Sequence, residues 1–189
     1  MEYTGVDGVM IGMSRDMVTL LAPLIPSLRR YARSMVRDHA AADDLVQDCL
    51  EKAISRWHQR RSEGSARTWV FTILHNLAVT GFRQAARRGT HVPIEEVCES
   101  GLATPATQGD RLNQSAVIDA LGRLSEDQRS VLLLVAIEEL SYAEAAQVLA
   151  IPIGTVMSRL SRARQRFAQI VDEPARDGPT RQTMLRSVK

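Results

Sequence analysis

The sequence predicts an all-α fold in which two small helical domains are joined by a flexible linker. Of its 189 residues, 44% are hydrophobic but only 4% are aromatic, and the abundant Ala, Leu and Arg favour helices over strands. Helical periodicity runs through residues 16–86, stops in a stretch rich in Gly, Pro, Ser and Thr, and returns over residues 113–170. We therefore expect a loose leader, a first domain, a linker, a second domain and a tail, at residues 1–15, 16–88, 89–112, 113–171 and 172–189.

Charge and cysteine content limit the classes of function. The 24 basic and 22 acidic residues give a formal net charge of only +2, so any nucleic-acid site must come from local clustering of basic residues. Cys49 and Cys98 lie far apart and form no disulfide framework, which suits a reducing cytosol. No apolar run reaches the roughly 18 residues of a membrane span, and no secretory signal is visible, so the expected location is the cytoplasm.

The second domain contains a helix-turn-helix pattern. Ser125 and Ser141 each begin a capping box, in which Gln or Glu follows three residues later, and so mark the starts of two helices. The helix after Ser141 is expected to be short, at about residues 142–149. Pro152 enforces a break, and a long helix is expected from about Gly154. A short helix, a tight turn and a longer helix make a helix-turn-helix.

The long helix has an apolar side and a basic side. On a helical wheel, the predicted packing face occupies an arc of about 60° and comprises Val156, Leu160, Ala163 and Phe167. An arc of about 100° on the other side carries Thr155, Ser158, Arg159, Arg162 and Arg166. Arg164 lies on another flank, and no acidic residue occurs between residues 154 and 170. A solvated surface helix commonly pairs opposite charges, so the pattern favours DNA recognition over a simple solvated basic side.

The run from residue 43 to residue 57 in the first domain also has two sides. Its apolar stripe predicts burial of Val46, Cys49, Leu50, Ala53 and Trp57. A wedge of three carboxylates and a neighbouring amide, here called the acidic face, consists of Asp44, Gln47, Asp48 and Glu51. Three interpretations are open: a solvated surface with an Asp48–Lys52 pair, a docking face for a basic partner helix, and a metal site. The metal site is the least favoured, because helical spacing spreads the carboxylates along a surface and no histidine joins them.

Residues 66–88 are aromatic early and basic late. One side of the predicted helix carries Asn76, Thr80, Arg83 and Arg87. Four ring side chains allow two interpretations: Trp69, Phe71, His75 and Phe82. They could pack in the core, or they could form a surface that stacks unpaired bases. For Trp69 the core role is favoured.

Together these segments resemble the extracytoplasmic-function sigma factors, the small two-domain specificity subunits of bacterial RNA polymerase. Residues 43–48 are similar to the family's polymerase-docking motif, and residues 66–77 resemble its promoter-melting helix. Residues 124–129, 140–146 and 154–164 resemble its second DNA-binding domain. The resemblance covers about residues 20–170, with the motifs in the family's order.

The resemblance implies a role for each segment. The acidic face would dock on the polymerase clamp helices, the loop at residues 60–65 would help to capture a flipped base, and the linker would thread toward the RNA exit path. The minus-ten element would be read as a single strand by His75, Asn76, Thr80, Arg83 and Arg87. The minus-thirty-five element would be read in its major groove by Thr155, Ser158, Arg159, Arg162 and Arg166. The implied partners are core RNA polymerase (clamp helices and flap), promoter DNA and an anti-sigma factor.

Enzymatic activity is not expected. The sequence contains no GxSxG, Walker-type or HExxH motif and no histidine–cysteine metal spacing, so we expect no catalytic residue, metal, cofactor or small-molecule substrate. Two rival functions are a stand-alone helix-turn-helix regulator that binds duplex DNA without polymerase, and a metal-dependent interaction module or small hydrolase that uses the acidic face.

Three positions depart from the family pattern. Gly81 inside a helix costs about 1 kcal/mol relative to Ala, so we expect the helix to bend or fray there. Ala150 stands in a turn where the family often has Gly, and it would be mildly strained if the backbone there is left-handed. Pro152 replaces the commoner hydroxyl residue, so the recognition helix is expected to begin without a side-chain cap.

Overall fold

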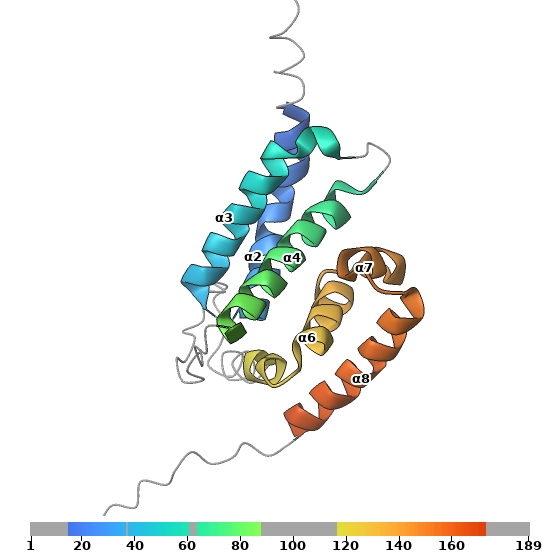
Figure 1. Cartoon of the computed structure of the whole chain (residues 1–189). Helices are drawn as coiled ribbons and strands as arrows, with labels where there is room; N and C mark the ends of the chain where they lie inside the picture. The colour runs from blue at the N-terminus through green and yellow to red at the C-terminus, as the bar shows by residue number, and fades with distance from the viewer. Residues whose placement is uncertain (1–14, 37, 61–63, 88–116, 173–189) are drawn as a thin grey trace, which may run out of the picture.

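The structure is a computed structural model that describes residues 15–36, 38–60, 64–87 and 117–172 (Figure 1). These residues form helices and their connections and contain no β-strand, which confirms the predicted all-α class. The predicted linker, Cys98, and nearly all of the predicted leader and tail lie outside the described residues.

The first domain is built on three long helices. A helix at residues 15–21 and the short η1 (Ala22–Leu24) lead into α2 (Ile25–Val36), which is followed by α3 (His39–Ser55), η2 (Trp57–Gln59) and α4 (Ala66–Arg87). Helices α2, α3 and α4 lie side by side (Figure 1). Their shared core includes the fully buried Leu28, Tyr31, Phe71 and Leu74. The rings of Tyr31 and Phe71 meet edge to face with centroids 5.6 Å apart, an arrangement that aromatic pairs prefer.

The predicted apolar stripe of α3 faces this core. Val46, Cys49 and Ala53 are buried, while Leu50 and Trp57 are half-buried. The Cys49 thiol lies 3.6 Å from the Val70 carbonyl oxygen, to which it donates a weak hydrogen bond. Burial raises the pKa of the Cys49 thiol to about 12, so it stays protonated and acts as a small packing group.

Helix α4 does not end at Gly81, where the sequence predicted that it would bend or fray. It continues through Gly81 to Arg87, so the prediction that it frays at the glycine was wrong. No atom outside the local helix backbone would lie within 4 Å of a Cβ added at Gly81. The glycine is therefore not required by close packing, and the helix tolerates its entropic cost.

The second domain contains the predicted helix-turn-helix. A helix at residues 117–122 is followed by α6 (Glu126–Leu132), the π-helical η3 (Leu133–Ile137), α7 (Tyr142–Leu149) and α8 (Ile153–Asp172). Both predicted capping boxes are confirmed: the Ser125 hydroxyl accepts from the Gln128 amide at 3.3 Å, and the Ser141 hydroxyl accepts from the Glu144 amide at 3.2 Å. These caps fix where α6 and α7 begin.

The turn between α7 and α8 is made by Ala150. Its backbone is left-handed, with φ 52° and ψ 43°. The sequence predicted mild strain for Ala150 in this conformation, because the alanine Cβ is disfavoured there. Helix α8 begins one residue earlier than expected, at Ile153. The Pro152 carbonyl oxygen accepts from the backbone amides of Thr155 and Val156, at 2.9 and 3.1 Å. The turn thus redirects the chain within three residues, 150–152.

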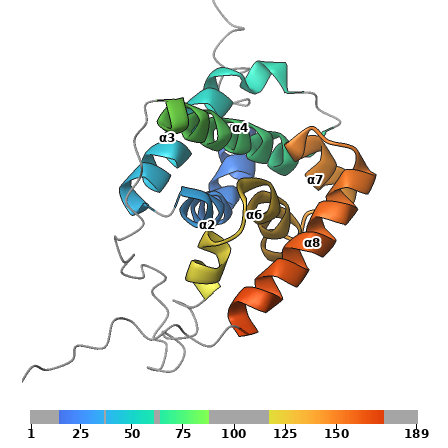
Figure 2. The same cartoon turned by 60° about the horizontal axis from the view of Figure 1, so that its bottom comes forward.

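The two domains pack against each other. Helix α4 packs on α7, and α2 packs on α6 and η3 (Figure 2). Their buried apolar side chains form one continuous cluster. The sequence predicted two domains on a tether, and the structure adds an extensive interface between them.

A buried carboxylate joins the domains across this interface. The Glu138 side chain is fully buried, and its two oxygens accept from the guanidinium of Arg30 at 2.8 and 2.9 Å. Arg67 lies 3.5 Å from the same carboxylate and also donates to the Glu138 carbonyl oxygen. We call these three residues the Glu138 cluster. It links η3 of the second domain to α2 and α4 of the first.

Two further polar contacts cross the interface. The Thr68 hydroxyl on α4 donates to a carboxylate oxygen of Glu144 at 3.2 Å. Arg129 on α6 donates to the Met35 carbonyl oxygen at 2.8 Å. Its other nitrogens donate to carbonyl oxygens at the end of the helix at residues 117–122, where a cation is favourable.

Inside the first domain, Tyr31 and His75 form a buried polar pair. The Tyr31 hydroxyl lies 3.0 Å from Nδ1 of His75. Burial lowers the pKa of His75 to about 4 and raises the pKa of Tyr31. His75 is therefore neutral in the folded protein near pH 7.

Replacement of Glu138 by Gln tests the Glu138 cluster. We expect Glu138→Gln to lower the free energy of unfolding by about 1.5–3 kcal/mol, because it weakens charge-assisted hydrogen bonds to two arginines. Urea unfolding followed by circular dichroism measures the change. Glu139→Gln is the matched control, because Glu139 is exposed. Equal stability of the two variants would contradict the assigned role.

The buried His75 predicts a dependence of stability on pH. An unfolded histidine titrates near 6.5 and the folded one near 4, so the unfolded state binds more protons between these values. This contribution is complete above pH 6.5 and is lost as the pH falls toward 4, by about 1.4 kcal/mol per unit. Urea unfolding between pH 7.5 and 5 should show a shallower slope for His75→Gln than for the wild type, and an unchanged slope for the exposed His58→Gln. Parallel slopes for the wild type and His75→Gln would rule out the histidine as the source.

Candidate nucleic-acid interface

The acidic face lies on the outer side of α3. Asp44, Gln47, Asp48 and Glu51 are all exposed, on the side of the helix opposite the buried stripe. The Gln47 side-chain amide donates to Glu51 at 3.0 Å. Within the described ranges, no ion pair joins Asp48 to Lys52, and no group of three His, Cys, Asp or Glu side chains could hold a metal ion. The face therefore presents carboxylates to the solvent.

The neighbouring Asp43 does not contribute to the acidic face. Its carboxylate lies 3.7 Å from Arg29 and 3.4 Å from Arg33 on α2. These ion pairs are exposed and add little to stability.

One side of α4 presents polar and basic groups. Asn76, Thr80, Arg83 and Arg87 are exposed along it. The Thr80 hydroxyl donates to the Asn76 carbonyl oxygen at 2.7 Å. His75, which the sequence grouped with them, is only 9% exposed and is bound to Tyr31. The ring is therefore part of the core and does not belong to the exposed side of α4.

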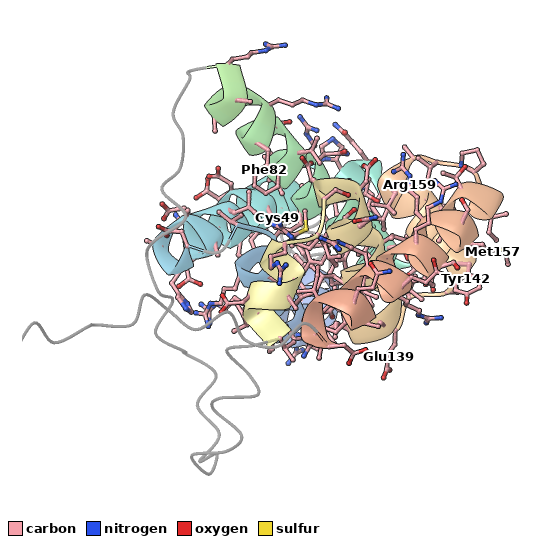
Figure 3. All side chains as sticks on the ribbon, turned by 90° about the horizontal axis from the view of Figure 1, so that it is seen from below. Cys49, Phe82, Glu139, Tyr142, Met157 and Arg159 are labelled. Atoms are coloured by element: carbon pink, nitrogen blue, oxygen red, sulfur yellow. The ribbon has the colours of Figure 1, made fainter. Side chains whose placement is uncertain are left out.

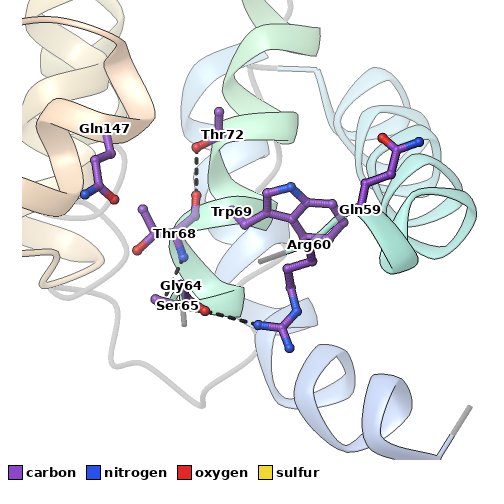
Figure 4. Close-up of a pocket in the computed structure, with 8 residues that line it drawn as sticks. All are labelled: Gln59, Arg60, Gly64, Ser65, Thr68, Trp69, Thr72 and Gln147. Atoms are coloured by element: carbon purple, nitrogen blue, oxygen red, sulfur yellow. Dashed lines mark hydrogen bonds between the residues drawn. The ribbon is translucent and has the colours of Figure 1, made fainter. Parts of the chain in front are cut away.

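A cavity of about 320 Å³ opens at the start of α4 (Figure 4). It is lined by Gln59, Arg60, Gly64, Ser65, Thr68, Trp69, Thr72 and Gln147. The Arg60 guanidinium lies 4.8 Å from the centroid of Trp57, which packs edge to face against Trp69 at 6.0 Å. Trp69 is half-buried, so it serves the core and also forms an aromatic wall of the cavity. Gln147 comes from α7, so the second domain helps to close this cavity.

A second cavity, of about 510 Å³, lies between the domains. It is lined by His75, Val79, Arg83, Ser125, Glu126, Asp127, Leu149, Ile151 and Arg159. Arg159 of α8 makes an ion pair with Asp127 at 3.1 Å. Burial, followed by the charge of Asp127, raises the pKa of Glu126, whereas Arg83 opposes that shift. Basic side chains from α4 and α8 therefore share one cavity with two carboxylates.

Helix α8 confirms its predicted packing face. Val156, Leu160 and Ala163 are buried, and Phe167 is half-buried. Among the predicted DNA-reading residues, Ser158, Arg162 and Arg166 are exposed, whereas Thr155 and Arg159 are half-buried. The Ser158 hydroxyl donates to the Thr155 carbonyl oxygen at 3.1 Å. The arginines thus occupy two different environments, which the helical wheel did not separate.

Family models match both domains. Residues 21–75 match the sigma2 domain of PhyR, and residues 114–167 match region 4 of sigma-70. Among the described helices, none combines the length and the apolar character that a membrane span requires.

Relatives of similar length include sigma factors. The ECF RNA polymerase sigma factor EcfG of Rhodopseudomonas palustris is 32% identical over 153 residues, which are 78% of this chain and 80% of EcfG. The RNA polymerase sigma-E factor of Streptomyces coelicolor is 32% identical over 143 residues, which are 76% of this chain and 78% of that protein.

Solved structures show the same fold. The sigma factor RpoE of Bartonella quintana, in complex with the anti-sigma factor NepR, is similar with a TM-score of 0.72 and 33% identity, over 83% of this chain and 97% of RpoE. CnrH, in complex with the cytosolic domain of CnrY, has a TM-score of 0.65 and 26% identity, over 84% of this chain and 89% of CnrH. Both domains match in the same order, and the chain belongs to the extracytoplasmic-function (ECF) family of RNA polymerase sigma factors.

Proposed function

We propose that this sigma factor directs RNA polymerase to a promoter through three separate surfaces. The acidic face of α3 binds the clamp helices of core RNA polymerase. The exposed side of α4 reads the melted minus-ten strand through Asn76, Thr80, Arg83 and Arg87. Helix α8 enters the major groove of the minus-thirty-five element. The observation that carries the proposal is the exposed basic side of α8, which no acidic residue of that helix interrupts before Asp172.

Promoter binding requires the two domains to separate. The names of the two elements place them about 25 base pairs apart, which is roughly 85 Å of duplex at about 3.4 Å per base pair. In the structure, Arg83 of α4 and Arg159 of α8 line a single cavity, so the two surfaces are far too close to reach both elements. The packed arrangement is therefore a form that cannot bind both promoter elements, and binding to polymerase separates its two domains.

An anti-sigma factor is the proposed regulator. RpoE and CnrH are similar to this chain over most of its length, and they are in complex with NepR and with the cytosolic domain of CnrY. A partner of that kind holds this chain away from polymerase in the cytoplasm. The chain itself performs no catalysis and takes no small-molecule substrate.

A second candidate function is that of a sigma-like protein that binds an anti-sigma factor without starting transcription. The match of residues 21–75 to the sigma2 domain of PhyR favours it, because PhyR is an anti-anti-sigma factor. The stand-alone regulator considered from the sequence is a third candidate, but it leaves the acidic face without a role.

Transcription in vitro separates these candidates. Core RNA polymerase, the full chain and a library of genomic fragments should yield transcripts from specific start sites that are absent without the chain. Gel shifts with and without core polymerase run alongside. Tight, sequence-specific duplex binding by the isolated chain would favour a stand-alone regulator. Failure of the chain to bind core polymerase, without such duplex binding, would favour the sigma-like protein.

Asp48→Arg tests the polymerase-docking surface. The substitution reverses a charge at the centre of the acidic face, and like charges across an interface cost several kcal/mol. We expect loss of co-purification with core polymerase and an unchanged circular dichroism spectrum, because Asp48 is exposed. Asp16→Arg is the control, an equally exposed charge reversal on the helix at residues 15–21. Normal assembly by Asp48→Arg would reject the docking role.

Arg162→Ala tests the groove-reading side of α8. We expect it to weaken use of the minus-thirty-five element by about 1–3 kcal/mol and to relax base preference at one position, as for loss of a bidentate contact. Arg164→Ala removes another exposed arginine, from the other flank, and should leave base preference unchanged. Run-off transcription on promoter variants measures both, and an unaltered preference in Arg162→Ala would refute the contact.

A further inference from the structure

We propose that Met157 reads a thymine methyl group in the minus-thirty-five duplex. This inference rests on the proposed function of α8 and adds an apolar contact to a surface so far described by its arginines and hydroxyls. Met157 was not among the residues predicted from the sequence.

Met157 has no place in the core of the protein. Its side chain is 50% exposed, whereas Val156 before it and Leu160 after it are buried. Figure 3 shows Met157 at the outer edge of α8. Ile153, one turn earlier, is 49% exposed, so the two side chains form an apolar strip at the amino-terminal end of the helix.

Arg159, in contrast, lies on another flank of α8 and lines the cavity between the domains. It is held at 3.1 Å by Asp127 of α6, and its side chain is 31% exposed. On a helical wheel it lies about 160° from Met157. The outward surface of α8 is therefore centred between Met157 and Arg162, and Ser158, Ser161 and Gln165 lie between them, all exposed.

The position of Met157 fits a base contact. The residues at the amino-terminal end of a recognition helix are those that reach base edges in the major groove. Among the groups exposed there, the thymine C5-methyl is the apolar one, and it distinguishes thymine from the other bases. The arginines along α8, with no acidic residue beside them before Asp172, are complementary to the phosphates on either side of the groove. Duplex DNA is therefore the occupant that fits both the charge and the apolar strip.

The test exchanges thymine for deoxyuridine, which removes the methyl group alone. Holoenzyme assembled from core polymerase and the full chain first selects its preferred minus-thirty-five sequence from a randomised duplex library. Each thymine of that sequence is then replaced singly by deoxyuridine, and affinity is measured by fluorescence anisotropy. With the wild type we expect one exchange to weaken binding about fourfold, the factor that corresponds to one buried methyl-sized group. With Met157→Ala the same exchange should have no further effect, because the partner of the methyl is already absent.

Val171→Ala is the matched control. Val171 is also an apolar residue of α8 and is also 50% exposed, but it lies at the far end of the helix. It should retain the full response to deoxyuridine.

Three results would overturn the proposal. The wild type could respond to no exchange while still requiring the element. Met157→Ala could remain as sensitive as the wild type. Met157→Ala could weaken holoenzyme assembly without altering the response, which would assign Met157 to polymerase. A wild-type holoenzyme that is indifferent to the whole minus-thirty-five element would instead refute the proposed function, and the contact with it.

Discussion

The packed form of this chain depends on the buried carboxylate of Glu138. A carboxylate without water must be paired, because transfer of an unpaired charge into an apolar interior is prohibitively costly. Here both oxygens are engaged by Arg30, and Arg67 contacts the side chain and the backbone carbonyl of the same residue. One residue thus fixes η3 against two helices of the other domain. The apolar cluster that runs through both domains supplies affinity, and the Glu138 cluster supplies the register.

The same interaction is compatible with opening. The Arg30 and Arg67 side chains remain 42% and 36% exposed, so both are already partly hydrated. When the domains separate, water replaces protein partners at all three groups, and the net cost is smaller than that of breaking a fully buried pair. Binding to polymerase and promoter then has to offset this cost together with that of exposing the apolar interface between the domains. In the packed form, Gln147 of the second domain borders the cavity at the start of α4. Separation of the domains would uncover this cavity.

Features that depend on neighbours three or four residues apart could be predicted from the sequence. The capping boxes at Ser125 and Ser141, the buried stripe of α3 and the packing face of α8 are of this kind, and together they identified the family. The Glu138 cluster could not be predicted, because Arg30 lies 108 residues away and no local pattern distinguishes buried Glu138 from exposed Glu139. His75 was placed on the surface for the same reason, since its partner Tyr31 is 44 residues away. The fraying expected at Gly81 did not occur, because intrinsic propensity is a weak guide once a helix is packed along its length.

Helix α8 shows how burial changes the meaning of a charge pattern. On a wheel, Arg159 and Arg162 are neighbours and carry equal weight. In the structure, Asp127 sits 3.1 Å from Arg159, and its charge offsets part of the attraction of that side chain for a phosphate. The ion pair instead helps to hold α8 against α6, and so orients the helix from its inner flank. The charge that orients the helix is thereby separated from the charge and the apolar surface that we propose read DNA. A recognition helix needs both, because base contacts specify a sequence only when the helix is held in a fixed register on the duplex.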